Sequence, residues 1–174
     1  MSVTIVAATA DDTRALGTRL AALLRPGDLL VLSGDLGAGK TTFTQGLGAG
    51  LRVRGGVTSP TFVISRVHPS LVGGPALVHV DAYRLGPSTG SGDAALELDD
   101  LDLDTSLDEA VTVVEWGTGV AEELAEDRLE IEILRAHGDA VDEEGETRTV
   151  RLSPVGDRWA GVDLCAALSA VAGA

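Results

Sequence analysis

The sequence predicts an α/β fold in which a mixed β-sheet carries helices on both faces. Short apolar runs of strand length alternate with stretches of helical periodicity along the chain. One of these runs, residues 29–32, leads through a glycine-rich loop at 34–41 into a helix start. Two later strand candidates are joined by too few residues for a crossover helix, so we expect them to pair antiparallel. Together these features are typical of a P-loop NTPase-like mixed sheet with antiparallel strand additions.

The first quarter of the chain contains a strand, a helix, a second strand and a second helix. Residues 3–7 form a short apolar strand candidate, and 11–24 place leucines at helical spacing after an acidic first turn. Pro26 and the glycine after it end this helix and lead into the strand at 29–32. The helix that follows the glycine-rich loop is expected to end at about Leu51.

The middle of the chain is expected to add an antiparallel pair of strands and a linker. Residues 62–67 are rich in β-branched side chains, and 76–81 form an apolar strand that ends in an acid. Residues 86–92 are rich in Pro, Ser, Thr and Gly and indicate a linker. The acidic segment 93–103 carries leucines, which favour a helix followed by irregular structure.

The last third is expected to complete the sheet. Residues 110–115 form an apolar run suited to a buried central strand, and 120–125 predict a short helix. Residues 129–134 alternate apolar and acidic side chains and should pair with 147–152 as a hairpin. The segment 162–171 predicts a final apolar helix.

Bulk properties narrow the class of protein. The 174 residues suit a single domain spanning 1–174. No apolar run approaches the roughly 20 residues of a membrane span, and no secretory signal is visible, so a cytoplasmic protein without membrane contact is expected. A lone cysteine, Cys165, excludes an internal disulfide framework, and its apolar surroundings predict a packed core thiol. The net charge of −14 argues against direct binding of nucleic acid.

The glycine-rich loop matches the P-loop pattern G-x-x-x-x-G-K-[ST] over residues 34–41. Its glycines let several backbone N–H groups point at a phosphate, and the following helix adds its positive end. Lys40 is then expected to reach the β- and γ-phosphates, and the Thr41 hydroxyl to ligate Mg²⁺. Lys40 is the only lysine, because the other twelve basic residues are arginine. The guanine-recognition motif [NT]-K-x-D therefore cannot occur, and ATP is the expected nucleotide.

A P-loop needs an acidic partner at a strand end to hold the metal or orient water. Asp81 follows the apolar run 77–80, and Glu115 follows the run 111–114. Open α/β sheets place their ligand sites at such strand ends. The residues alone do not rank the two acids.

Four further features are candidates for the site, each with a simpler structural interpretation. The segment 59–61, Ser-Pro-Thr, could sense the γ-phosphate or simply begin a strand. His79 could be a base, but a histidine in an apolar strand is more often packed. Arg84 could pair with Asp81 or a phosphate, and Trp116 could face the nucleotide, a partner or the core.

The combined motifs resemble the TsaE (YjeE) family of bacterial P-loop ATPases, which is needed for the threonylcarbamoyladenosine modification of tRNA. The resemblance covers about residues 3–135, and four segments carry it: 34–43, 59–62, 79–85 and 115–116. The C-terminal portion matches poorly, and the 86–92 insert and the acidic stretch 139–146 depart from the family.

The resemblance implies a role for each matched residue. Lys40 and the neighbouring amides would bind phosphate, Thr41 and Glu115 would bind Mg²⁺, and Asp81 would support catalysis. The segment 59–61 would act as a switch-like loop, and Thr13 corresponds to a family position near the adenine. The resulting nucleotide-binding set comprises Thr13, Gly37, Ala38, Gly39, Lys40, Thr41 and Thr42.

The resemblance also implies partners. Proteins of this family act with TsaD and TsaB, which carry the transferase chemistry on tRNA, so tRNA would be reached only through the complex. The expected function is an ATP-hydrolysing accessory subunit for N6-threonylcarbamoyladenosine formation. Two alternatives stay open: a small-molecule P-loop kinase, and a nucleotide-dependent binding switch whose hydrolysis is incidental.

Overall fold

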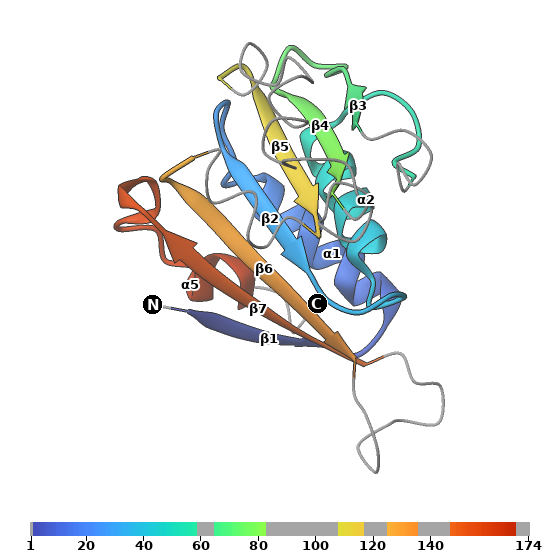
Figure 1. The fold of residues 1–174 in the computed structure, drawn as a ribbon, viewed down its shortest axis with the longest axis vertical. Coiled ribbons are helices and arrows are strands. Elements are labelled where there is room, and N and C mark those ends of the chain that lie inside the picture. The colour runs from blue at the N-terminus through green and yellow to red at the C-terminus, as the bar shows by residue number, and fades with distance from the viewer. Residues whose placement is uncertain (1, 59–64, 83–107, 117–124, 136–146, 170–174) are drawn as a thin grey trace, which may run out of the picture.

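The computed structural model describes residues 2–58, 65–82, 108–116, 125–135 and 147–169. Within these ranges seven strands join one sheet in the order β1-β7-β6-β2-β5-β4-β3 (Figure 1). The strands are β1 Val3–Ala7, β2 Leu29–Ser33, β3 Ser65–His68, β4 Ala76–Asp81, β5 Ala110–Glu115, β6 Arg128–Arg135 and β7 Arg148–Val155. The helices are α1 Ala10–Ala21, α2 Lys40–Leu51 and α5 Leu164–Ser169, with a 3₁₀ turn, η5, at Asp157–Trp159.

The sheet is mixed, as the sequence predicts. Strand β2 pairs in parallel with both β5 and β6, and β5 pairs in parallel with β4. Antiparallel strands flank this group on both sides, because β3 pairs with β4 while β7 pairs with β6 and β1. The parallel strands therefore end at one edge of the sheet, where a ligand site is expected.

The three helices share one apolar core on one face of the sheet. Side chains of α1, α2 and α5 pack with alternate residues of β2, β4, β5, β6 and β7. A second, smaller cluster on the other face contains Leu29, Val31, Val78, Val80 and Val114. Strands β4 and β5 are buried along nearly their whole length, which explains their continuous apolar runs. The helices expected over 93–103 and 120–125 fall outside the described residues, apart from the last position of the second one.

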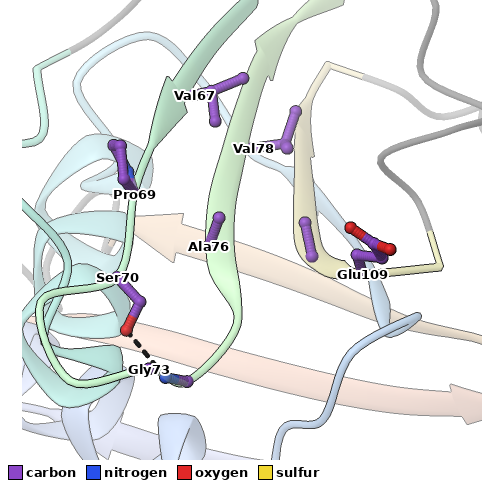
Figure 2. A pocket seen from close by; sticks show the side chains of 9 residues that line it. Val67, Pro69, Ser70, Gly73, Ala76, Val78 and Glu109 are labelled. Atoms are coloured by element: carbon purple, nitrogen blue, oxygen red, sulfur yellow. Dashed lines mark hydrogen bonds between the residues drawn. The ribbon is translucent and has the colours of Figure 1, made fainter.

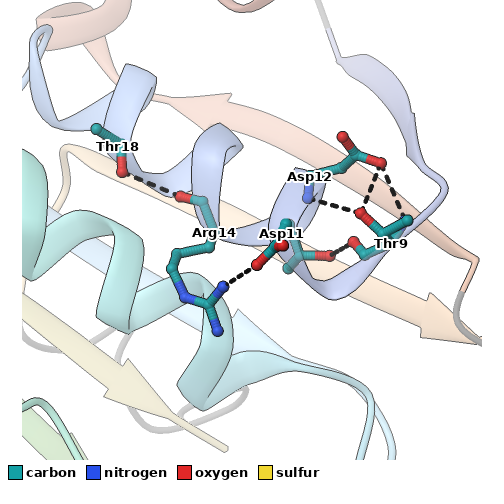
Figure 3. A network of polar contacts seen from close by, with 6 residues as sticks. Thr9, Asp11, Asp12, Arg14 and Thr18 are labelled. Carbon is teal, nitrogen blue, oxygen red and sulfur yellow. Dashed lines mark hydrogen bonds and ion pairs between the residues drawn. The ribbon is translucent and has the colours of Figure 1, made fainter.

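A capping box begins α1 (Figure 3). The Thr9 hydroxyl accepts a hydrogen bond from the Asp12 backbone N–H, and the Asp12 carboxylate accepts one from the Thr9 N–H. The helix ends at Ala21, three residues before the predicted Leu24. Residues just before a proline avoid helical dihedrals, so Pro26 shortens the last turn.

Glycines bring α1 and α2 into backbone contact. A Cβ at Gly46 would lie 2.0 Å from the Arg14 carbonyl oxygen, and one at Gly17 would lie 2.3 Å from the Phe43 carbonyl oxygen. Gly50 faces Thr18 and Ala21 in the same way, and the Thr18 hydroxyl donates to the Gly46 carbonyl. These contacts hold α1 and α2 together along much of their length.

A buried ion pair closes the sheet at the amino end of β2. The Arg158 guanidinium contacts both oxygens of Asp28, at 2.6 Å and 2.8 Å, and donates to the Leu23 carbonyl. The Arg25 backbone N–H also donates to Asp28, at 2.9 Å. The guanidinium lies over the Trp159 ring at 4.4 Å from its centroid. These contacts give the buried guanidinium and carboxylate groups partners in place of the water that burial removes.

The remaining expectations have mixed outcomes. Cys165 is exposed, so the prediction of a packed core thiol is wrong: α5 turns Leu164 and Leu168 inward, and Cys165 lies on its outer side. Strand β3 begins at Ser65, while 62–64 lie outside the described residues. The segment 86–92 and the turn at 137–146 also lie outside them. No helix among the described residues is long and apolar enough to cross a membrane.

Candidate nucleotide-binding site

The P-loop takes a backbone path that only glycine follows easily. Gly34, Gly37 and Gly39 have φ angles of 139°, 75° and 107°. A Cβ at Gly34 would also lie 2.3 Å from the Ile133 carbonyl oxygen of β6, so the loop runs tightly against the sheet. The loop then enters α2 at Lys40, and the positive end of that helix faces the loop. This geometry suits binding of a phosphate.

Lys40 is the buried cation of the site. Its ammonium donates to the carbonyl oxygens of Gly34 and Asp35, at 2.8 Å and 3.0 Å. It also lies 3.8 Å from the centroid of the Trp116 ring, and only 5% of the residue is exposed. Burial lowers the pKa of Lys40 below its ordinary value, whereas the negative charges nearby, Glu115 first, oppose this shift. The Lys40 ammonium therefore lies between the loop and nearby carboxylates.

The two strand-end acids lie next to one another. Asp81 and Glu115 are directly opposite in the β4–β5 register, and both are buried. Glu115 is also opposite Leu32 of β2, the strand that leads into the P-loop. Both carboxylates act on the charge of Lys40. The structure thus brings Lys40, Asp81 and Glu115 together.

His79 is hydrogen-bonded to one of these acids, Glu115. Its Nε2 atom lies 2.7 Å from Oε1 of Glu115, and both side chains are almost completely buried. The sequence prediction that His79 is packed is confirmed, because none of the residue is exposed. The contact with Glu115, 36 positions further along the chain, was not predicted.

Trp116 belongs to the site. It has a φ angle of 62°, a left-handed conformation that costs a non-glycine residue roughly 1–2 kcal/mol. Its backbone N–H donates to the Leu32 carbonyl of β2 at 2.9 Å, and its ring faces the Lys40 ammonium. Strained residues often cluster at functional sites, which fits this position.

A small pocket opens on the outer side of the P-loop. Thr13 of α1 contributes to it and is itself buried; the other lining residues are Ala10, Gly37, Gly39, Thr42 and Arg148. The structure therefore brings Thr13 to the loop, as the expected nucleotide-binding set requires.

Arg148 is a pocket residue that sequence reasoning missed. Its Nε–H donates to the Ala38 carbonyl of the P-loop at 2.9 Å, across 110 positions of the chain. Its cross-strand partner is Arg135, whose guanidinium lies 3.8 Å from where a Gly37 Cβ would be. The sequence shows only an arginine at the start of a hairpin strand, which carries no signal of this contact.

The donors at the site fit a magnesium ion. Thr41 is the first residue after Lys40 in α2, and Glu115 supplies a carboxylate at the neighbouring strand end. In the described part of the chain no three His, Cys, Asp or Glu side chains form a cluster able to hold a metal. Mg²⁺ does not need such a cage, because it is usually bound by one or two protein oxygens together with phosphate and water.

A second hollow lies elsewhere on the molecule (Figure 2). It is lined by the β3–β4 turn around Ser70 and by the first residues of β4 and β5, Ala76 and Ala110. Asp81 and Glu115 stand at the opposite ends of those two strands. This hollow is therefore separate from the P-loop. The segment 59–61 and Arg84 lie outside the described residues, so their expected roles stay predictions.

The comparisons with known proteins agree on one family. The model of the family "Threonylcarbamoyl adenosine biosynthesis protein TsaE" matches residues 7–144. A protein of Streptomyces coelicolor named tRNA threonylcarbamoyladenosine biosynthesis protein TsaE is 62% identical over 87% of this chain and 96% of its own length. The protein of that name from Bacillus subtilis is 38% identical over 86% of this chain and 84% of its own.

A solved structure supports the fold. The crystal structure of YdiB from Bacillus subtilis superposes with a TM-score of 0.71 at 32% sequence identity. The match covers 97% of this chain and 95% of that one. The mixed α/β architecture predicted from the sequence is thereby confirmed.

Proposed function

This chain belongs to the TsaE family, and from that membership and the geometry of its P-loop we propose that it is an ATPase of tRNA modification. It would hydrolyse ATP with Mg²⁺ during N6-threonylcarbamoyladenosine formation at position 37 of tRNAs. The observation that carries the proposal is the arrangement of Lys40 between the P-loop and the paired acids Asp81 and Glu115. The P-loop supports binding of a nucleotide, and the paired acids support hydrolysis.

Each residue of the site has a proposed task. The amides of Gly37, Ala38 and Gly39 would cradle the phosphates, and the Lys40 ammonium would leave its loop carbonyls to neutralise the β- and γ-oxygens. Thr42, in the first turn of α2, and Thr13, across the pocket, would contact the rest of the nucleotide.

The two acids would divide the remaining work. Thr41 and Glu115 would hold Mg²⁺, which would neutralise charge developing on the phosphates. Asp81 lies opposite Glu115 and would orient the attacking water.

The charge of the chain supports action through partners. A net charge of −14 is unfavourable for a protein that would grip tRNA phosphates by itself. We therefore propose that TsaD-like and TsaB-like proteins hold the tRNA, and that this chain drives the complex by hydrolysing ATP. The names of its relatives, which refer to tRNA threonylcarbamoyladenosine biosynthesis, support this placement.

The test is an ATPase assay with and without partners. The purified protein should hydrolyse ATP slowly alone and faster with TsaD and TsaB, and Lys40→Ala should lower the rate at least about 100-fold. Arg151→Ala is the control, because Arg151 lies on β7 and pairs with Glu132 in an exposed ion pair.

The outcomes separate the alternatives. Hydrolysis that is unaffected by the partners would count against the accessory role. Transfer of phosphate to an added small molecule would indicate a kinase. If a variant that binds ATP without hydrolysing it still supported tRNA modification, the protein would be a binding switch.

A further inference from the structure

The buried contact between His79 and Glu115 has a consequence for metal binding. Glu115 is 3% exposed and His79 is fully buried, so both polar groups depend on protein partners. The distance of 2.7 Å between Nε2 and Oε1 is that of a strong, charge-assisted hydrogen bond.

The second ring nitrogen of His79 identifies the donor. Nδ1 is buried and has no hydrogen-bond partner among the described residues. If Glu115 donated a proton to Nε2, the ring would have to carry its own proton on Nδ1, as a buried and unsatisfied donor. With the proton on Nε2, which then donates to the Glu115 carboxylate, Nδ1 is left as an unpaired acceptor instead, and buried N–H groups without an acceptor are rarer in proteins than buried acceptors without a donor.

The strand register explains why His79 reaches Glu115. His79 is opposite Val113 in the β4–β5 pair, and Glu115 lies two residues further along β5 on the same face. Val111 and Val113 on that face pack in the helix-covered core. The imidazole is thus fixed by packing on a rigid strand, and it approaches the carboxylate from the core side.

We propose that His79 is a positioning residue for the metal site: it commits Oε1 of Glu115 to a hydrogen bond and so fixes the orientation in which the second oxygen can ligate Mg²⁺. This inference rests on the proposed function, because it takes Glu115 as the metal ligand. Outer hydrogen-bond partners of ligating carboxylates commonly change metal affinity 10–100-fold when removed.

A matched pair of variants tests the contact. In His79→Gln the longer amide places its nitrogen near the position of Nε2, whereas the shorter amide of His79→Asn reaches only the position of Nδ1. Both variants keep a polar, buried side chain. We expect His79→Asn to weaken Mg²⁺ binding about 10–100-fold, and His79→Gln to stay within about threefold of the wild type.

The measurement is a Mg²⁺ titration of the ADP-bound protein, followed by Trp116 fluorescence. Trp159→Phe serves as the background, since Trp159 is the other of the two tryptophans and lies beside Arg158. ADP affinity in EDTA and the melting temperature are measured on the same samples. A selective loss appears as a shifted Mg²⁺ midpoint with unchanged ADP affinity in EDTA.

Three results would overturn the inference. These are equal Mg²⁺ midpoints in wild type and His79→Asn, equal losses in both variants, or a fall in melting temperature without a change in the midpoint. A wild-type protein that binds no nucleotide would instead contradict the proposed function. If His79→Asn does not fold, a His79→Gln variant with a wild-type midpoint supports the role of the Nε2–H donor, and one with a weakened midpoint contradicts it.

Discussion

Buried charged side chains lie at both ends of β2, but the partners of these side chains differ. At the amino end, Asp28 and Arg158 meet in a two-point ion pair that is completed by backbone groups, by the Trp159 ring and by the more distant Arg25 guanidinium. At the carboxyl end, Lys40 donates to carbonyls of its own loop, and burial lowers its pKa despite the acids nearby. The first arrangement is matched internally. The second keeps its charges available, as a site for an anionic nucleotide and its metal requires.

This difference has an energetic meaning. A lowered lysine pKa means that the folded protein disfavours the ammonium relative to water, so the site end carries a cost in stability. The Asp28–Arg158 pair carries none of the proposed chemistry, and breaking it would leave one buried charge without a partner. Substitutions at the two ends should therefore separate stability from activity.

The largest expected effect comes from removing the ion pair at the amino end of β2. Arg158→Met should destabilise the fold by about 3–5 kcal/mol, because the buried Asp28 would lose both close contacts to its main counter-ion. This corresponds to a melting temperature lowered by about 10 °C for a chain of this size. ATP hydrolysis by the folded protein at low temperature should be nearly unchanged. Calorimetry and an ATPase assay at 15 °C measure the two quantities.

Two controls accompany this variant. Arg151→Met removes a pair with Glu132 in which the two side chains are 50% and 40% exposed, and it should cost at most about 1 kcal/mol. Lys40→Met should do the reverse of Arg158→Met and abolish hydrolysis without lowering the melting temperature. A larger loss of stability in Lys40→Met than in Arg158→Met would refute the comparison.

The second effect concerns the helices between the two ends. Alanine usually stabilises a helix relative to glycine, but a Cβ at Gly46 would lie 2.0 Å from the Arg14 carbonyl oxygen. Gly46→Ala should therefore destabilise the protein by about 1–3 kcal/mol. It should also weaken nucleotide binding, since α1 carries Thr13 to the loop.

Gly48→Ala is the matched control for this contact. Its Cβ would meet methyl groups of Val57, Val53 and Leu77, at 2.7 Å, 3.3 Å and 3.6 Å, and side chains can yield more easily than backbone. Urea denaturation should place Gly48→Ala between the wild type and Gly46→Ala. Equal stabilities of all three proteins would show that the helices separate without cost.

The part of the fold that the sequence predicted was local. The P-loop pattern, the acidic first turn of α1 and the apolar runs of β4 and β5 each depend on neighbouring residues, and all appear where expected. Asp81 and Glu115 were found because parallel strands end at one edge. That rule placed both acids at the same edge of the sheet, although the sequence did not give the distance between them.

The contacts that were missed join distant positions. The pairs His79–Glu115, Arg148–Ala38 and Arg158–Asp28 are separated by 36, 110 and 130 residues. A single sequence shows no signal for such pairs, because each side chain has an ordinary local context. Cys165 was misjudged for a related reason: a short helix in an apolar segment still has an outer side, and the composition does not show which residue faces it.

The third prediction concerns the P-loop at the carboxyl end of β2. Arg148→Ala should weaken ADP binding about tenfold, the loss typical of one hydrogen bond that involves a charged group, because the Ala38 carbonyl loses its donor. Arg151→Ala is the control on the same strand, since Arg151 pairs with Glu132 instead. Calorimetric titration with ADP measures both. A tenfold loss in both variants would mean that overall charge, and not the loop contact, sets the affinity.

The smallest expected effect is a pH dependence from His68 on β3. Burial lowers the pKa of His68 below its ordinary value, and the nearby His79 ring and Arg66 guanidinium act in the same direction, while a backbone hydrogen bond with Arg54 opposes them. The unfolded chain therefore binds a proton more readily than the folded chain as the pH falls below about 6.5, so the wild type loses stability there. His68→Leu should remove less than about 1 kcal/mol of this acid-induced loss. Chemical denaturation at pH 8.0 and 5.5 measures it as the difference between the two proteins, and an equal or larger acid loss in His68→Leu would show that His68 titrates alike in both states.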